Sequence, residues 1–182
     1  MFGNTERIAR AVADGLRDSG FDVTCTDVRD TQLGTPVGAD LLVVGAPTHG
    51  FSLSRPRTRA DAVRQGAPSD HAEVGLREWL GQSRPDPGVN ALPVAVFDTR
   101  VSKARMLPAA ARKAAKLARQ RGFQLIGPPG AFMVDDTPGP LNAGETERAT
   151  RWAESIARIF LEQRGSAPAR TDDARTDHGS GR

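Results

Sequence analysis

Two runs of consecutive apolar residues constrain the fold of this chain more than any other feature. Residues 40–46 read DLLVVGA, and residues 92–97 read LPVAVF. A strand with one face in water alternates apolar and polar side chains, whereas a strand that is covered on both faces is apolar nearly throughout. The two runs therefore predict inner strands of a parallel sheet with helices on both sides.

Segments with helical periodicity surround these two runs. In residues 4–19, Ile8, Val12 and Leu16 fall on one apolar stripe, and Gly20 ends the segment. Further helices are expected at 57–65, 71–80, 108–121 and 145–163, the last with a buried stripe of Trp152, Ile156, Ile159 and Phe160, and an interrupted strand is expected at 123–126 and 131–134. This alternation predicts an α/β fold: a doubly wound parallel sheet in a three-layer sandwich.

Residues 21–27 predict one more strand because their side chains alternate between apolar and polar. Phe21, Val23 and Cys25 would share one face, so Cys25 is expected to be a small core residue rather than a reactive thiol. The Gly/Pro-rich residues 29–38 are expected to hold a short helix or only a loop.

Length and composition limit the function classes. The 182 residues suit one domain, expected at 1–164, and the tail at 165–182 is expected to be disordered because it has scarcely any apolar side chains. The sequence has no long apolar run, no signal peptide and a single cysteine, which favours a cytoplasmic protein without a membrane span. The net charge of +3 is too small to indicate a nucleic-acid binder. A basic run at 100–121 is either a solvated helix face or a docking face for an acidic partner.

Three short loops carry the residues that suggest a ligand. Gly3, Asn4 and Thr5 begin the first helix, where free backbone N–H groups and a hydroxyl can bind an anion. Residues 47–51 follow the first apolar run, and residues 98–100 follow the second. Because ligands of doubly wound folds bind outside the carboxyl ends of the strands, the three loops are expected to form one site.

These loops resemble those of the flavodoxin family. Phe2-Gly3-Asn4-Thr5, followed by Ile8-Ala9, is similar to the second half of the family's phosphate loop, and Pro47-Thr48-His49-Gly50 resembles its second flavin loop. The resemblance extends over residues 1–163 and implies a flavodoxin-like domain of the short type with FMN as cofactor. The implied cofactor-binding residues are Phe2, Gly3, Asn4, Thr5, Pro47, Thr48, His49, Gly50, Phe51, Asp98, Thr99 and Arg100.

Several of these residues have two interpretations. His49 or Phe51 can lie against a face of the flavin ring, or His49 is a partly exposed loop residue. Asp98 is either a carboxylate beside the flavin, which would lower its reduction potential, or a residue that caps a local turn. Thr99 is either a ligand donor or a plain turn residue.

The chain also departs from the family pattern. The strand that should precede the phosphate loop is missing, which would leave an unfilled slot between the strands at 21–27 and 40–46. One hypothesis is that the natural product starts about eight to ten residues upstream, the length of one strand, so that this chain is truncated and binds FMN weakly. The chain has no tyrosine, which leaves one face of the flavin ring more open, and it is slightly basic where electron-carrier flavodoxins tend to be acidic.

The leading hypothesis is an FMN-binding redox protein of the flavodoxin-like superfamily. It would be an electron carrier or a flavin-dependent reductase, working with a redox partner protein or with a small acceptor such as a quinone. No catalytic residue and no metal site is identified in the sequence, and it lacks the motifs of a dinucleotide-binding Rossmann domain or a response-regulator receiver domain. The alternative is a cofactor-less interaction or regulatory domain.

Overall fold

The computed structural model describes residues 2–34, 37–87, 91–104 and 109–166. Its centre is a parallel sheet in which β1 (Leu42–His49) pairs with one side of β3 (Pro93–Val101). The short β4 (Gln124–Leu125) and β5 (Gly130–Val134) pair with β3 as well, also in parallel, and together form the interrupted strand that the sequence predicts. β2 (Ser52–Leu53) is antiparallel to the last two residues of β1.

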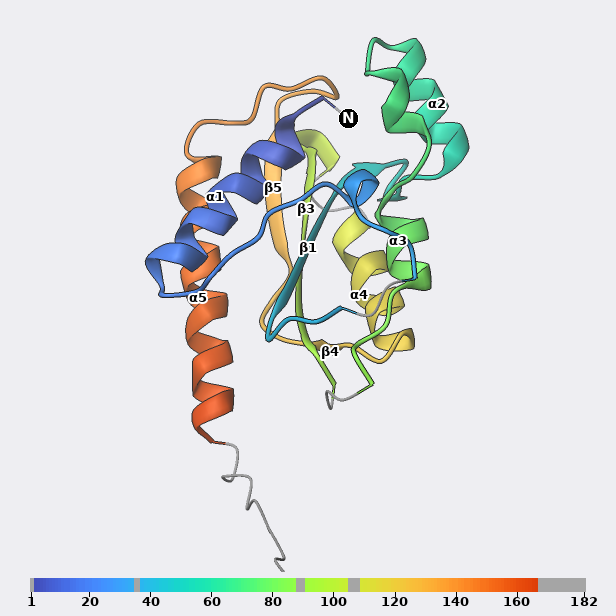
Figure 1. Ribbon diagram of the computed structural model, residues 1–182. Coiled ribbons are helices and arrows are strands. Elements are labelled where there is room, and N and C mark those ends of the chain that lie inside the picture. Colours follow the sequence, from blue (N-terminus) through green and yellow to red (C-terminus); the bar gives the residue numbers. More distant parts are fainter. Residues whose placement is uncertain (1, 35–36, 88–90, 105–108, 167–182) are drawn as a thin grey trace, which may run out of the picture.

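Helices cover both faces of this sheet (Figure 1). The helices α1 (Asn4–Asp18) and α5 (Glu145–Gly165) pack on one face. The helices α3 (Leu76–Gln82) and α4 (Ala110–Gln120) pack on the other. The shorter α2 (Pro56–Arg64) lies beyond the carboxyl end of β1, beside the loop that leaves this strand (Figure 1). The α/β class and the doubly wound, three-layer arrangement are thus confirmed.

The two cores differ in the side chains that fill them. Under α4, the sheet packs against a row of small residues, among them Ala110, Ala114 and Ala118, so that this helix lies close to the strands. Under α5, the core is aromatic: the ring of Phe97 lies edge-on to Phe132 and Trp152 at centroid distances of 5.8 and 5.9 Å. The apolar runs of β1 and β3 face both cores, which is why they contain no polar alternation.

The predicted strand at 21–27 is wrong. These residues have no regular secondary structure, and Figure 1 shows them leaving the end of α1 and running apart from β1. A strand forms only when a neighbour receives its backbone hydrogen bonds, and no strand pairs with residues 21–27 in the described part of the chain. The assignment of Cys25 to the core is wrong for the same reason, because its side chain is exposed.

Other expectations need smaller corrections. The helix expected at 71–80 is a 3₁₀ turn at Ser69–Ala72 followed by α3, which begins at Leu76. The described residues of the segment 29–38 hold the end of a 3₁₀ turn at Val28–Asp30 and an isolated parallel bridge between Val37 and Pro85. Pro108, where the fourth helix was expected to begin, and the tail from residue 167 lie outside the described residues. Among the helices that are described, none has the length and hydropathy needed to cross a bilayer.

Candidate functional site

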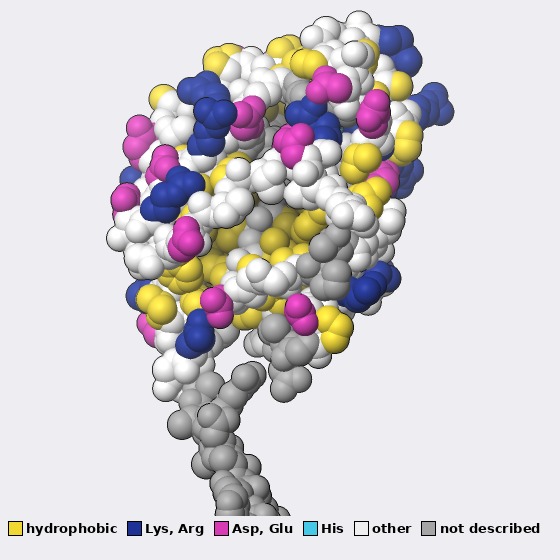
Figure 2. Space-filling model, in the orientation of Figure 1, with side chains coloured by type: hydrophobic (Ala, Val, Ile, Leu, Met, Phe, Trp, Pro, Cys, Tyr) yellow, Lys and Arg dark blue, Asp and Glu magenta, His cyan; other side chains and the backbone are white. Residues whose placement is uncertain are grey.

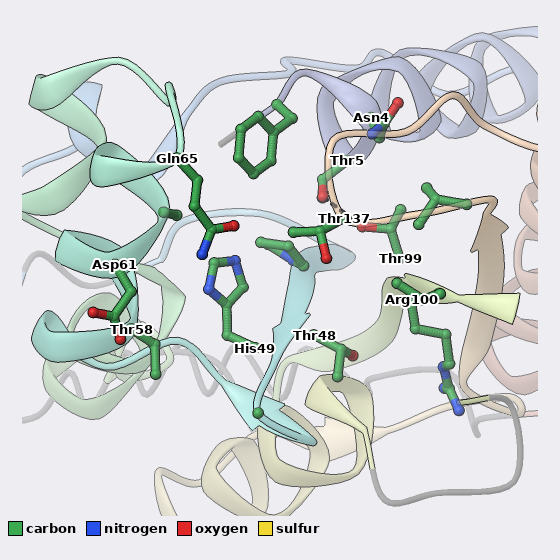
Figure 3. A pocket seen from close by; sticks show the side chains of 16 residues that line it. Asn4, Thr5, Thr48, His49, Thr58, Asp61, Gln65, Thr99, Arg100 and Thr137 are labelled. Carbon is green, nitrogen blue, oxygen red and sulfur yellow. Dashed lines mark hydrogen bonds between the residues drawn. The ribbon is translucent and has the colours of Figure 1, made fainter. Parts of the chain in front are cut away.

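A cavity of about 220 Å³ lies at the carboxyl ends of β1 and β3 (Figure 3). The start of α1, the loop after β1, the end of β3 and one side of α2 form its walls. All three predicted loops contribute to it, as the strand-end rule for doubly wound sheets requires. Nine of the twelve predicted site residues line the cavity: Phe2, Asn4, Thr5, Pro47, Thr48, His49, Gly50, Thr99 and Arg100.

Three predicted site residues do not line this cavity. Gly3 lies beside it as the N-cap of α1. Phe51 points into solvent and is 51% exposed. Asp98 is fully buried, and its carboxylate accepts hydrogen bonds from the guanidinium of Arg100 and from the backbone N–H of Ala111. Asp98 was expected either to lie beside the flavin or to cap a local turn, and its bonds to protein groups resemble the second arrangement.

The first turn of α1 presents backbone N–H groups toward the cavity. Gly3 has φ of 79°, a left-handed conformation that a residue without a Cβ adopts at little cost, and no side chain caps the helix. The N–H groups of Asn4 and Thr5 therefore lack an intrahelical acceptor. The hydroxyl of Thr5 lies 2.7 Å from that of Thr99, so the first turn is tied to the end of β3 (Figure 3). A helix dipole, free amides and hydroxyls are the groups that can receive an anion at a helix N-terminus.

The loop after β1 is a two-residue hairpin turn. His49 pairs with Ser52, and the two residues between them, Gly50 and Phe51, have φ of 52° and 59°. Two successive positive φ values are the signature of a type I′ turn, in which the twist of the turn matches that of the strands. Arg77 of α3 donates to the Ser52 hydroxyl and to the carbonyl of Leu53, which holds the second arm of the hairpin in place.

His49 is the ionisable side chain with a perturbed pKa that lines the cavity. Burial lowers its pKa below the ordinary value, and the positive charge of Arg59 acts in the same direction, while a hydrogen bond with the backbone of Thr58 opposes them. Figure 3 shows the imidazole between Thr48 and the side-chain amide of Gln65. The neutral imidazole favoured here can both donate and accept a hydrogen bond.

The lowered pKa predicts how stability depends on pH. An unfolded histidine titrates near pH 6.5, so the unfolded chain binds this proton more readily than the folded protein does. The free energy of unfolding should therefore rise with pH up to about pH 6.5 and lose this contribution as pH falls through the lower pKa of folded His49. Urea unfolding between about pH 5 and pH 7.5 measures this. His49→Gln should remove that part of the slope, and an unchanged slope would contradict the prediction.

Sequence reasoning missed the wall that α2 provides. Three residues of this helix, Thr58, Asp61 and Ala62, line the cavity, and so does its C-cap residue Gln65. Thr58, Asp61 and Gln65 present polar side chains there (Figure 3). Val101, Val134 and Thr137 complete the lining. The sequence predicts a helix at 57–65, but no local pattern indicates that this helix folds back over the end of β1.

A buried arginine fixes α2 in that position. Arg59 is 2% exposed, and its guanidinium donates to the carbonyls of Ala72 and Glu73 and to the Glu78 carboxylate. These acceptors lie in the segment that leads into α3 and in α3 itself. Arg59 therefore ties this wall of the cavity to α3 and to the segment before it.

Solved structures with the same fold share little sequence with this chain. A flavodoxin from Streptococcus pneumonia matches with a TM-score of 0.59 and 20% identity, covering 90% of this chain and 93% of that one. Oxidised flavodoxin 1 from Bacillus cereus gives 0.57 and 16%, with 89% and 92% covered. A flavodoxin from the domain Archaea gives 0.57 and 15%, with 88% and 93% covered. At these identities, the matches establish the fold.

The family of this chain is identified by its sequence. No curated protein matches the chain. The sequence model described as flavodoxin, however, matches residues 1–152, which include all the loops that form the cavity. The chain therefore belongs to the flavodoxin family.

Proposed function

We propose that the protein binds FMN in this cavity and transfers electrons between a reductase and an acceptor. Family membership implies FMN as the cofactor. The observation that carries the proposal is the convergence of three loops, far apart in the sequence, on one cavity beside an uncapped helix N-terminus. The Thr5 and Thr99 hydroxyls, which come from two of these loops, lie 2.7 Å apart.

The residues present fit the two ends of this cofactor. A phosphate needs N–H and O–H donors without a nearby side chain in the way, which Gly3, Asn4 and Thr5 offer. The flavin ring needs polar groups at its edge, which the loops around Thr48, His49 and Thr99 offer. The bound flavin would supply the electron-accepting ring, and this chain would supply binding, orientation and electrostatics.

A flavin-dependent reductase acting on a small acceptor such as a quinone is the second candidate. The chain contains no tyrosine, and Phe51, a candidate to stack on the flavin, points away into solvent. One face of a flavin bound here would thus be open to a small molecule. Turnover of a quinone with NAD(P)H by the flavin-loaded protein favours the reductase, and reduction of a protein acceptor without quinone turnover favours the carrier.

The Thr5 hydroxyl tests where the phosphate binds. Thr5→Val should weaken FMN binding by about 10- to 100-fold, because a hydrogen bond to a charged group contributes about 1.5–3 kcal/mol. Quenching of flavin fluorescence during titration measures the affinity. Thr5→Ser, which keeps the hydroxyl, should bind like the parent.

The chain offers a matched control for this change. Thr146 is the second residue of α5, as Thr5 is of α1, and both helices have a left-handed glycine as N-cap. Thr146→Val removes the same group away from the cavity and should leave the FMN affinity unchanged. Equal affinities of the Thr5→Val variant and the parent would place the phosphate elsewhere, and no flavin binding by the parent protein would overturn the proposed function.

A further inference from the structure

The basic side chains of this protein are concentrated in one stretch of the sequence. Residues 100–121 contain eight lysines and arginines and no aspartate or glutamate. Since the whole chain has a net charge of only +3, the rest of the sequence is net negative. Charges of one sign that are gathered in one place attract an oppositely charged partner, whereas mixed charges cancel. Apart from Arg100, none of the described basic residues of this stretch lines the cavity, so the proposed flavin site does not account for them.

Four of these cations form one face of α4. They fall within an arc of about 120° around the helix axis and span about 10 Å along it, as the helical repeat requires for their spacing. The opposite side of α4 is buried and contains the alanines that pack on the sheet. All four side chains are exposed to solvent, and together they are the basic face: Arg112, Lys113, Lys116 and Arg119.

The basic face has no acidic partner within the described part of the chain. None of its four side chains forms an ion pair or a hydrogen bond with another described residue. On the side of the molecule that holds α1, by contrast, Figure 2 shows basic and acidic side chains next to each other. There Arg10 pairs with Glu6, and Arg17 pairs with Asp14. The positive charge of α4 is therefore left available to a partner outside the chain.

The placement of these charges does not favour the helix itself. Arg112 and Lys113 are the third and fourth residues of α4, whose first turn contains no acidic residue, and the helix dipole disfavours cations at this end. Arg112 and Lys116 are four positions apart, a spacing at which like charges repel. The helices α1 and α5 instead have Glu6 and Glu145 in their first turns. Side chains that oppose the stability of their own helix are expected where they serve binding.

One end of the basic face lies at the cavity. The backbone N–H of Ala110, two residues before Arg112, donates to the hydroxyl of Thr48 at 3.1 Å, and Thr48 lines the cavity. A molecule bound on the basic face would therefore lie beside the proposed flavin site. A protein fits this position better than a single-stranded nucleic acid does, because α4 has no aromatic side chain on which a base could stack.

We propose that the basic face is the docking surface for an electron-transfer protein whose own contact surface is rich in aspartate and glutamate. The inference rests on the proposed function, since a protein that exchanges electrons with a bound flavin must dock beside the cavity. Carboxylates opposite the four cations select this partner and set its orientation. Because the charges are exposed, they speed association, and dissolved salt weakens the complex.

Binding of an acidic plant-type ferredoxin to the full chain, without added flavin, tests the proposal. An NMR titration reports both the dissociation constant and the amides whose signals shift, and the shifts should centre on α4. Raising the salt concentration from about 0.02 M to about 0.3 M should weaken binding by about 10-fold or more. Cytochrome c, which is basic, should not bind.

Two matched double variants locate the surface. Arg112→Glu with Arg119→Glu reverses two charges on α4, and Arg151→Glu with Arg158→Glu makes the same change, at the same spacing, at exposed positions of α5. The α4 variant should bind ferredoxin about 10-fold more weakly or worse, whereas the α5 variant should stay within about 2-fold of the parent. Arg112→Gln with Arg119→Gln removes the charges without reversing them and should give an intermediate loss. Urea unfolding checks that each variant folds.

Equal ferredoxin binding by the α4 and α5 variants, or no binding by the parent, would overturn the proposal. It would also be overturned if a short DNA duplex, or vesicles of phosphatidylserine and phosphatidylcholine, bound the basic face more tightly than ferredoxin does. The flavin site is tested separately, because every one of these variants should keep the FMN affinity of the parent. A parent that binds ferredoxin through α4 but does not bind FMN would refute the proposed function and leave the docking surface in place.

Discussion

Arg59→Met is expected to lower the free energy of unfolding by about 3 kcal/mol, the lower end of the range for breaking a buried ion pair. The guanidinium is 2% exposed and lies 3.1 Å from the Glu78 carboxylate, whose side chain is 28% exposed. Methionine fills a similar volume but donates nothing, so the carbonyls of Ala72 and Glu73 also lose their donor. The partial exposure of Glu78 keeps the loss from being larger, since water can solvate the orphaned carboxylate. Urea unfolding followed by circular dichroism measures the change.

The same helix provides the control. Arg57 lies two residues earlier in α2 and is exposed, so Arg57→Met should shift the free energy of unfolding by no more than about 0.5 kcal/mol. Equal losses in the two variants would show that the buried network of Arg59 contributes nothing specific. Because α2 forms a wall of the cavity, the Arg59→Met variant should also bind FMN more weakly than the Arg57→Met variant does.

Phe132→Ala is expected to destabilise the fold by about 3–5 kcal/mol, the usual range for deleting a buried aromatic side chain. The ring of Phe132 is fully buried, lies edge-on to Phe97 and Trp152, and carries the guanidinium of Arg148 at 4.9 Å from its centroid. These neighbours belong to β3 and α5, so the resulting cavity would open where the sheet meets the helix. Thermal or urea unfolding measures the loss.

Phe51 makes a matched comparison for this deletion. Its side chain is 51% exposed, and its backbone φ is positive. Alanine at this position meets the same backbone strain as phenylalanine, so the substitution adds none. Phe51→Ala should therefore change stability by only about 0.5 kcal/mol. A loss below about 1 kcal/mol for Phe132→Ala would mean that the aromatic core collapses around the missing ring without leaving a void.

The inner strands could be predicted from the sequence because their consecutive apolar side chains indicate burial on both faces of the sheet. The apolar side chains of β1 and β3 pack under the helices on one face or the other, so the apolar runs alone indicate the position of these strands. Residues 21–27 have an equally regular pattern and still fail to form a strand. Side-chain alternation shows which face a segment would bury, whereas strand formation also depends on a neighbouring backbone, and that neighbour is not encoded in the segment.

The candidate site shows the same division between local and tertiary information. The three loops could be placed from the sequence because each follows a strand or begins a helix at one end of a parallel sheet. The contribution of α2 could not, because it depends on Arg59, and arginine is usually an exposed residue that gives no sign of burial. The direction of the Asp98 side chain could not be predicted either, since its partner amide at Ala111 lies thirteen positions away in another element.

The pairing of Arg100 with Asp98 has a consequence for how the site attracts its ligand. Burial raises the pKa of Asp98, while the hydrogen bonds from Arg100 and from the Ala111 amide oppose that rise. The guanidinium of Arg100, which also lines the cavity, thus binds a carboxylate, and the opposite charges largely cancel at a distance. The anion would be received by amide dipoles and hydroxyls, whose fields fall off within a few ångströms. Dissolved salt screens such short-range attraction far less than it screens a lysine or arginine clamp, so the affinity for a phosphate should be nearly independent of ionic strength.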